Sequence, residues 1–420
     1  MASILSIVHN DLLGVNITYS DILYGISFYL IIIEKLSRKE KIAYFFQGYS
    51  ILWSILLFIG VGAFLSLSRT TEIFNSLSTY LQYIFIFVVL LSVVHYLVNQ
   101  SIQNAIKVIG IWVIPYMITS MVVVLSKIGI LTTFDSVIVA GSGRYQGFYG
   151  ISTALGINLT LGLIGMAFFW RISKKKFKII WILAISATLY SILLSGSFGS
   201  IIMSLITLIL IGYYCARRKV FMRILIGAFL LCAATVFVLK ETSSYFNLLI
   251  KYAPEILQTR LERSDGELGS FSLRMELNRM GLREFIRSPL VGVGFDQFRI
   301  HNIYNSNIHN TIIAAAVETG IIGLIGVLMY LLAPIIYGHR LMSLPWERFS
   351  KEYYFIRYMF VYTLIRLGQT MISGPYVRRE QWVPVLTLFA IYAYEKWKRR
   401  RTRAEESLPD IYHRNLPTTA

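Results

Sequence analysis

The sequence contains a series of apolar runs, each about as long as the hydrocarbon core of a bilayer is thick. These runs lie near residues 20–36, 42–67, 78–98, 105–126, 150–170, 179–195, 198–215, 220–239, 311–337, 355–373 and 381–396. An open sheet in lipid would leave backbone N–H and C=O groups without partners, so we interpret the runs as helices. The sequence therefore predicts an all-α polytopic membrane protein with about eleven transmembrane helices.

The composition agrees with a chain that meets little water. Of the 420 residues, 56% are hydrophobic and 15% are charged, whereas a soluble domain is about 25% charged. A net charge of +18 could indicate a nucleic-acid partner in a soluble protein. Here the basic clusters flank apolar runs, as cytoplasmic loops of membrane proteins do, so we expect no nucleic-acid partner.

The orientation of the spans follows from Lys and Arg in the short loops. If crossings alternate, one side receives most of the basic clusters: Arg38, Lys39 and Lys41; Arg171 and 174–176; 217–219; Arg340 and Arg348; and the tail residues 396–401. Basic loops remain in the cytoplasm. We therefore predict a cytoplasmic C-terminal tail and an N-terminus on the outer side.

The hydrophilic stretch before the ninth span divides the predicted chain into four regions. Residues 1–239 form an N-terminal membrane bundle of about eight spans, and residues 311–396 form a C-terminal bundle of about three. Between them, residues 240–310 are predicted to be an extracytoplasmic loop domain. Residues 397–420 form a basic cytoplasmic tail.

The predicted loop domain contains local structural signals close to the ninth span. Residues 270–287 are expected to form a helix, with Ser270 and Ser272 as candidate caps. A Gly-rich turn follows at residues 289–295. Asn310 is a plausible N-cap for the ninth span.

Two titratable residues near the ninth span are candidates for chemistry. The imidazole of His309 could take a proton from a hydroxyl at neutral pH, or His309 could be a capping or interfacial residue. Glu318 lies nine residues later, which on a straight helix places it about 13 Å away and half a turn out of phase. A charge within a span costs about 2.5–3.5 kcal/mol, so we expect Glu318 to face the bundle as a supporting residue, with direct catalysis as the alternative.

Several arginines could bind a phosphate, because a guanidinium holds phosphate oxygens through two parallel hydrogen bonds. Arg274 lies upstream in the same loop and could bind phosphate or form a surface ion pair. The other candidates for an anionic headgroup or a lipid diphosphate are Arg144, Arg366, Arg378 and Arg379. The sequence shows no cluster with metal-ligand spacing and no phosphate-binding or dinucleotide fingerprint, so we expect no metal and no cofactor.

The segment from Arg274 to Gly323 resembles the signature region of the O-antigen ligase and O-antigen polymerase family of membrane glycosyltransferases. It contains Arg274, the run Ser-Pro-Leu-Val-Gly-Val-Gly-Phe at 288–295, His309-Asn310 and Glu318-Thr319-Gly320. A second element, Arg-Tyr-Gln-Gly-Phe at 144–148, is similar to the family's Arg-x-x-Gly-Phe element.

One departure from the family pattern concerns an arginine. Members often carry a Ser-Arg-Gly element at the outer end of a middle span, whereas this chain has Ser-Gly-Ser-Phe-Gly-Ser at 195–200. Phe198 stands where the arginine is expected. This leaves Arg144, Arg274 or Arg366 to bind a diphosphate.

The resemblance implies a metal-independent transferase of the GT-C type in the plasma (inner) membrane, with its active site on the extracytoplasmic or periplasmic face. Its donor would be a polyprenyl-diphosphate-linked glycan and its acceptor a glycan or lipid, with membrane lipids and a chain-length regulator as further partners. In this interpretation Arg274, with Arg144, holds the diphosphate, and His309 orients or deprotonates the acceptor hydroxyl. The resemblance favours a polymerase; a ligase is the runner-up, and a lipid-linked oligosaccharide flippase is the alternative of another class.

Overall fold

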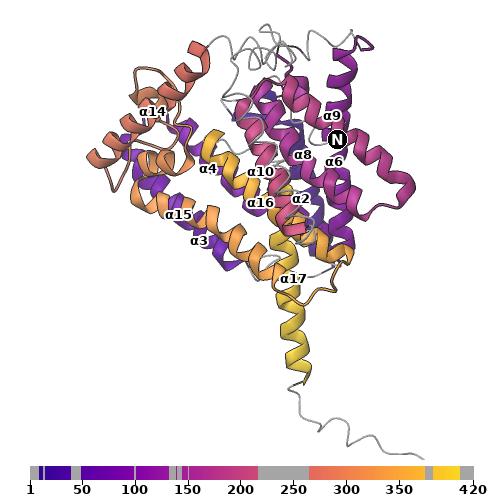
Figure 1. Ribbon diagram of the computed structural model, residues 1–420. Coiled ribbons are helices and arrows are strands. Elements are labelled where there is room, and N and C mark those ends of the chain that lie inside the picture. The colour runs from indigo at the N-terminus through magenta and orange to yellow at the C-terminus, as the bar shows by residue number, and fades with distance from the viewer. Residues whose placement is uncertain are drawn as a thin grey trace, which may run out of the picture.

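The computed structural model describes residues 9–12, 15–38, 49–98, 101–131, 139, 144–149, 151–215, 264–373 and 382–406. Nearly all of these residues are helical (Figure 1). The helices are α2 (Tyr19–Ser37), α3 (Ser50–Ser66), α4 (Ile73–Ile84), α5 (Leu91–Val98), α6 (Ile102–Lys127), α8 (Ser152–Ile172), α9 (Lys175–Leu194), α10 (Phe198–Cys215), α14 (Ser264–Arg287), α15 (Thr311–Met342), α16 (Lys351–Ser373) and α17 (Val383–Glu406). The all-α membrane fold is thereby confirmed.

Short elements complete the described part of the chain. The helical turns are η2 (Leu67–Arg69), η3 (Phe85–Leu90), η5 (Gly147–Tyr149) and η6 (Phe298–His301). Because η3 joins α4 to α5, residues 73–98 form one continuous helical rod. A small antiparallel hairpin, β1 (His9–Leu12) with β2 (Val15–Thr18), precedes α2 and pairs His9 with Thr18.

The predicted spans can be compared with these helices. Six helices of the described chain are long and apolar enough to cross a membrane: 50–69, 76–98, 102–127, 152–172, 175–194 and 311–342. A shorter apolar helix covers 199–215. The predicted spans near 20–36, 355–373 and 381–396 also coincide with helices, whereas 220–239 lies outside the described residues. The chain is thus a multi-pass membrane protein, and the count of eleven is not confirmed.

Glycines set how closely the central helices pack. A Cβ on Gly162 or Gly165 of α8 would lie within 2.6 Å of the side chains of Tyr116 and Val113 on α6. The absence of a side chain therefore lets α8 approach α6, as small residues do between helices in lipid. Most of α8 is buried, whereas α9 exposes Ile179 and Leu183 on its outer side.

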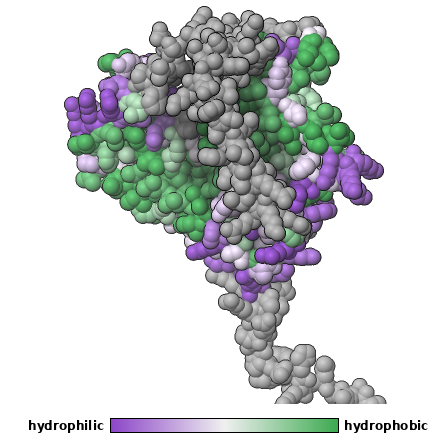
Figure 2. Space-filling view, viewed as in Figure 1, coloured by the Kyte–Doolittle hydropathy of each residue, from purple (hydrophilic) through white to green (hydrophobic). Residues whose placement is uncertain are grey.

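A second tight contact joins α3 to α15, which lie side by side in Figure 1. A Cβ on Gly62 of α3 would lie 2.6 Å from the Cα of Gly323, and one on Gly326 would lie 2.7 Å from the backbone nitrogen of Ile59. The two backbones therefore touch along this crossing. Figure 2 shows hydrophobic side chains over the α15 and α3 side of the molecule, and hydrophilic ones toward the base of α17.

Candidate functional site

Of the functional candidates, Glu318 lies at a break in α15, and Arg274 and His309 lie on segments that share a hydrophobic cluster with the helix before the break, whereas Arg144 and Arg366 lie on other elements. Gly320 has φ 64° and ψ −166°, which is not helical, so α15 consists of a short helix from Thr311 to Thr319 and a longer one after the break. The expectation of a straight ninth span was therefore wrong. The expectation that His309 and Glu318 lie half a turn out of phase assumed a straight helix, so it does not apply. A glycine explains the local conformation, because a residue with a Cβ rarely adopts this φ.

The Gly-rich turn predicted at residues 289–295 packs on this break and is called the clamp loop below. Its backbone makes three hydrogen bonds to the broken helix: Val293 N to Val317 O at 2.9 Å, Gly294 N to Glu318 O at 3.1 Å, and Ile321 N to Pro289 O at 2.8 Å. A break within a span would leave backbone groups unsatisfied in lipid. The clamp loop supplies their partners, so the loop and the break depend on each other.

Two glycines make this close approach sterically feasible. A Cβ on Gly292, whose φ is 77°, would lie 2.5 Å from the carbonyl oxygen of Glu318. A Cβ on Gly320 would lie 2.3 Å from the carbonyl oxygen of Leu290. Both positions combine a positive φ with backbone contact, which accounts for these two glycines.

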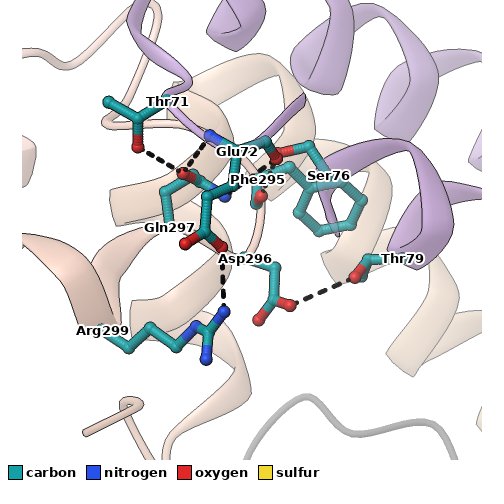
Figure 3. A network of polar contacts seen from close by, with 8 residues as sticks. All are labelled: Thr71, Glu72, Ser76, Thr79, Phe295, Asp296, Gln297 and Arg299. Atoms are coloured by element: carbon teal, nitrogen blue, oxygen red, sulfur yellow. Dashed lines mark hydrogen bonds and ion pairs between the residues drawn. The ribbon is translucent and has the colours of Figure 1, made fainter. Parts of the chain in front are cut away.

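Glu318 is buried at the break, beside a second carboxylate. The Oε2 atom of Glu318 accepts a hydrogen bond from the backbone N–H of Asp296 at 3.0 Å. The Asp296 side chain accepts one from the Thr79 hydroxyl at 3.4 Å (Figure 3). Burial raises the pKa of the Asp296 carboxyl, and the Arg299 guanidinium partly offsets this effect. The structure therefore places Glu318 as an acceptor that holds the chain just after the clamp loop.

Asp296 and its neighbours are the part of the site that the sequence did not reveal. Gln297 accepts hydrogen bonds from the Thr71 hydroxyl and the Glu72 backbone N–H, each at 3.1 Å, and Arg299 forms an ion pair with Glu72 at 2.9 Å (Figure 3). These contacts tie the residues directly after the clamp loop to the turn between α3 and α4. The available signal was the polar pair Asp296-Gln297 after a Gly-rich turn, but its partners lie more than two hundred residues earlier in the sequence.

His309 and Asn310 precede the short helix of α15. The Asn310 side chain accepts hydrogen bonds from the backbone N–H groups of Ile312 and Ile313 at 3.0 and 3.1 Å. The predicted N-cap is therefore confirmed. His309 is half-buried directly before this cap, so its position is set by the helix start.

Arg274 lies on α14, half-buried. The predicted helix at 270–287 is confirmed, but α14 begins at Ser264, so Ser270 and Ser272 lie inside it and are not its caps. Leu277 of α14 packs in one hydrophobic cluster with Ile308 and Val317. The segments that carry Arg274 and His309 therefore share a core, although the two side chains are on different elements.

Arg144 lies at the turn between α9 and α10. Its Nε–H donates to the carbonyl oxygen of Ser195 at 2.9 Å, and the next residue, Tyr145, bonds through its backbone N–H to Leu194 O at 3.3 Å. This turn begins the stretch 195–200, in which Phe198 replaces the arginine expected from the family pattern. Arg144 thus brings a guanidinium to the turn.

Arg366 has a different environment. It is buried within α16, and its guanidinium carbon lies 5.6 Å from the centre of the Trp382 ring. Aromatic contacts connect this position to the clamp loop: Phe295 to Tyr83 (6.1 Å), Tyr83 to Tyr330 (5.7 Å) and Tyr330 to Trp382 (4.4 Å). Arg366 is therefore enclosed by the bundle. Arg378 and Arg379 lie outside the described residues.

The potential for metal binding can be judged only for the residues that the structure describes. Among them, no group of three or more His, Cys, Asp or Glu side chains could hold a metal ion. Glu318 accepts a hydrogen bond from the backbone N–H of Asp296, and Arg299 forms an ion pair with Glu72. Arginines, a histidine and buried carboxylates therefore make up the candidate site.

The fold and this site define a multi-pass membrane protein. Its helix α15 is broken at Gly320, and the clamp loop binds to the break. Residues 183–328 match the model of a family described as O-antigen ligase. The matched region contains Arg274, His309 and Glu318, and it confirms the resemblance to the O-antigen ligase and polymerase family. The match supports an O-antigen ligase or polymerase type of function. A search of curated proteins found no match.

Proposed function

We propose that this protein is a metal-independent glycosyltransferase that polymerises polyprenyl-diphosphate-linked oligosaccharide units on the extracytoplasmic face of the plasma (inner) membrane. The observation that carries the proposal is the matched segment itself. Within it, the clamp loop fixes the break in α15, and the short helix that starts after His309 packs against α14, which carries Arg274. The segments that carry His309 and Arg274 thereby share one hydrophobic cluster.

The proposed reaction divides the chemistry between these two side chains. His309 orients the acceptor hydroxyl and accepts its proton as the oxygen bonds to the anomeric carbon of the donor. The bond from that carbon to the diphosphate oxygen breaks, and the polyprenyl diphosphate leaves with its electron pair. Arg274 stabilises the negative charge that develops on this leaving group. The acceptor of a polymerase is another lipid-linked repeat unit.

Arg144 is the second proposed ligand of the diphosphate. Its Nε–H donates to Ser195 O, and Arg144 thereby lies at the turn at which the family pattern has an arginine. Of the remaining candidates, Arg366 is enclosed near Trp382 and is proposed to support the site from within the bundle. Arg378 and Arg379 are proposed to attract the diphosphate or a headgroup on the basis of sequence alone.

A ligase is the second candidate, favoured by the description of the matching family. In that case the acceptor is the core of a lipid A molecule or another final acceptor. The two reactions share donor and leaving group, so the acceptor distinguishes them. Supplying the purified protein with lipid-linked repeat units alone gives longer lipid-linked chains only if it is a polymerase.

A flippase would move the lipid-linked glycan without altering it. The test uses proteoliposomes whose donor is accessible only from the side of the candidate site, in buffer with EDTA. We expect longer or transferred glycan, resolved by electrophoresis or mass spectrometry. Translocation of unaltered donor, with no new glycosidic bond, would contradict the proposal.

A further inference from the structure

The exposed side of α14 carries a stripe of apolar side chains beside its arginines, although the helix lies in a polar loop. Met275, Leu282 and Ile286 are 42%, 46% and 76% exposed. Spacings of seven and four residues place them on one face of the helix. Leu277, on the other side, is fully buried in the cluster with Ile308. α14 therefore has two apolar faces, and protein covers only one of them among the described residues.

This outer apolar face continues onto a membrane span. Leu290, just after α14, is 65% exposed, and its carbonyl lies beside Gly320. The next residue of α15, Ile321, bonds to Pro289 O and is itself exposed. From there the exposed apolar side chains follow one side of α15: Ile321, Ile325, Leu332 and Ile336. α15 is long and apolar enough to span a membrane, and in a spanning α15 this side would face acyl chains.

Arginines border the apolar face of α14. Arg279 and Arg283 follow Met275 by four and eight residues and are exposed. The contact of Arg279 with Glu276 is long, at 3.8 Å, and solvent-exposed, so its guanidinium is available to another anion. An apolar helical face flanked by arginines is typical of helices that lie in a membrane interface. In Figure 2 the hydrophobic surface over α15 is bordered at α14 by hydrophilic side chains.

We propose that α14 lies in the phospholipid interface at its end of the bundle. Met275, Leu282, Ile286 and Leu290 enter the boundary between headgroups and acyl chains, and Arg279 and Arg283 bind phosphate oxygens of anionic lipids. The apolar face of α14 continues into the lipid-facing side of α15, so we infer that lipid, and not another protein, covers it. This inference requires only that α15 spans the membrane. One consequence rests on the proposed function: Arg274 is held at the depth of lipid phosphates, where a polyprenyl diphosphate also lies.

The experiment measures the depth of two side chains of α14 in proteoliposomes of the full chain. Spin labels are placed by Ile286→Cys and, as a matched control on the flank of the same helix, by Glu276→Cys, with Cys215 and Cys232 replaced by serine. We expect the label at 286 to collide with dissolved oxygen and to be shielded from a water-soluble nickel chelate. The label at 276 is expected to be more accessible to nickel. Equal nickel accessibility at the two positions would overturn the proposal.

The role of the arginines is tested in vesicles of two compositions. Shielding of the label at 286 should increase when phosphatidylglycerol replaces part of the phosphatidylcholine, and this increase should be lost in Arg279→Gln with Arg283→Gln. If the increase in shielding persists in the double variant, the proposed headgroup contact is wrong. The same follows if the protein with both arginines shows no increase. Neither measurement needs a donor or a transfer reaction, so its result is independent of the proposed function.

Discussion

At the scale of single residues, Asp296 combines two unusual features. Its φ is 59°, in the left-handed region that few residues other than glycine, asparagine and aspartate adopt. Its carboxyl is largely buried, and burial raises its pKa above the ordinary 3.8. A raised pKa means that the folded state prefers the protonated acid. Its contribution to stability therefore falls as the pH rises from about the ordinary value through the folded pKa.

Replacement of Asp296 by asparagine tests this electrostatic cost. Asparagine tolerates the same backbone conformation but carries no charge, so Asp296→Asn should melt at a higher temperature than wild type near pH 7. The difference should shrink as the pH falls through the raised pKa of Asp296 toward its ordinary value, because the wild-type carboxyl then binds a proton and loses its charge. Purified protein is melted across this pH range. A wild-type protein that gains stability over the variant as the pH rises would contradict the assignment.

The control for that experiment is Asp296→Ala. Alanine also removes the charge, but a left-handed conformation costs a residue with a plain Cβ about 1–2 kcal/mol. Asp296→Ala should therefore be less stable than Asp296→Asn at every pH. This separates the backbone requirement from the effect of the buried charge.

At the scale of elements, sequence reasoning located the helices but not the break in α15. Apolar length predicted α8, α9 and α15, and the residue types around Asn310 predicted its cap. Gly320 gave no sign of a break, because a glycine within an apolar run is compatible with a continuous helix. The break is stabilised by the clamp loop, and that pairing depends on tertiary contacts that local patterns do not encode.

The same reason explains the other part of the site that could not be predicted. The contacts of Gln297 with Thr71 and of Arg144 with Ser195 join segments that are far apart in the sequence. Hydropathy and capping signals describe each segment by itself, so they cannot say which distant segments meet. The family resemblance identified the residues of the signature region without showing how they are held.

The clamp can be tested by Gly292→Ala. The new Cβ would combine an unfavourable φ with a position 2.5 Å from the Glu318 carbonyl oxygen, so the loop should detach from the break. Gly129→Ala is the matched control, because Gly129 has a similar φ of 79° but open space around it. We expect Gly292→Ala to lose clearly more thermal stability than Gly129→Ala. Equal losses would mean that only backbone strain matters and that no clamp exists.

The crossing of α3 and α15 gives a separate prediction. Gly62→Ala should destabilise the bundle, because its Cβ would lie 2.6 Å from the backbone of Gly323. Alanine in an open helical position instead stabilises a helix by up to about 1 kcal/mol relative to glycine. Gly25→Ala, with nothing within 4 Å, is therefore expected to be neutral or stabilising. Similar melting temperatures for the two variants would argue against a close crossing.

At the scale of the whole molecule, we propose the topology that the Lys and Arg distribution predicts. Residues 240–310 would be extracytoplasmic and the tail at 397–420 cytoplasmic, with membrane bundles at 1–239 and 311–396. In support, α14 and the end of α17 lie at opposite ends of the molecule (Figure 1). Reporter fusions at Gly266 and after Arg403 should report opposite sides. Both reporters on one side would rule out this arrangement.

The central claim is that His309 and Arg274 have separable roles in glycan transfer. Arg274→Lys keeps the charge but loses the planar guanidinium, so both donor binding and transfer should weaken. His309→Ala should retain donor binding and lose transfer by about 10²–10⁴-fold, the usual contribution of a positioned acid–base group. If His309 only supports the helix start, its loss would cost about 1 kcal/mol of stability and little activity.

The most direct measurement is the rate of glycan transfer by His309→Ala in proteoliposomes, normalised to folded protein, with donor binding measured in parallel. We predict a large loss of transfer with donor binding largely retained. Near-normal transfer by this variant would contradict the account and would move the catalytic role to Arg274 and the asparagine-rich approach at residues 302–310.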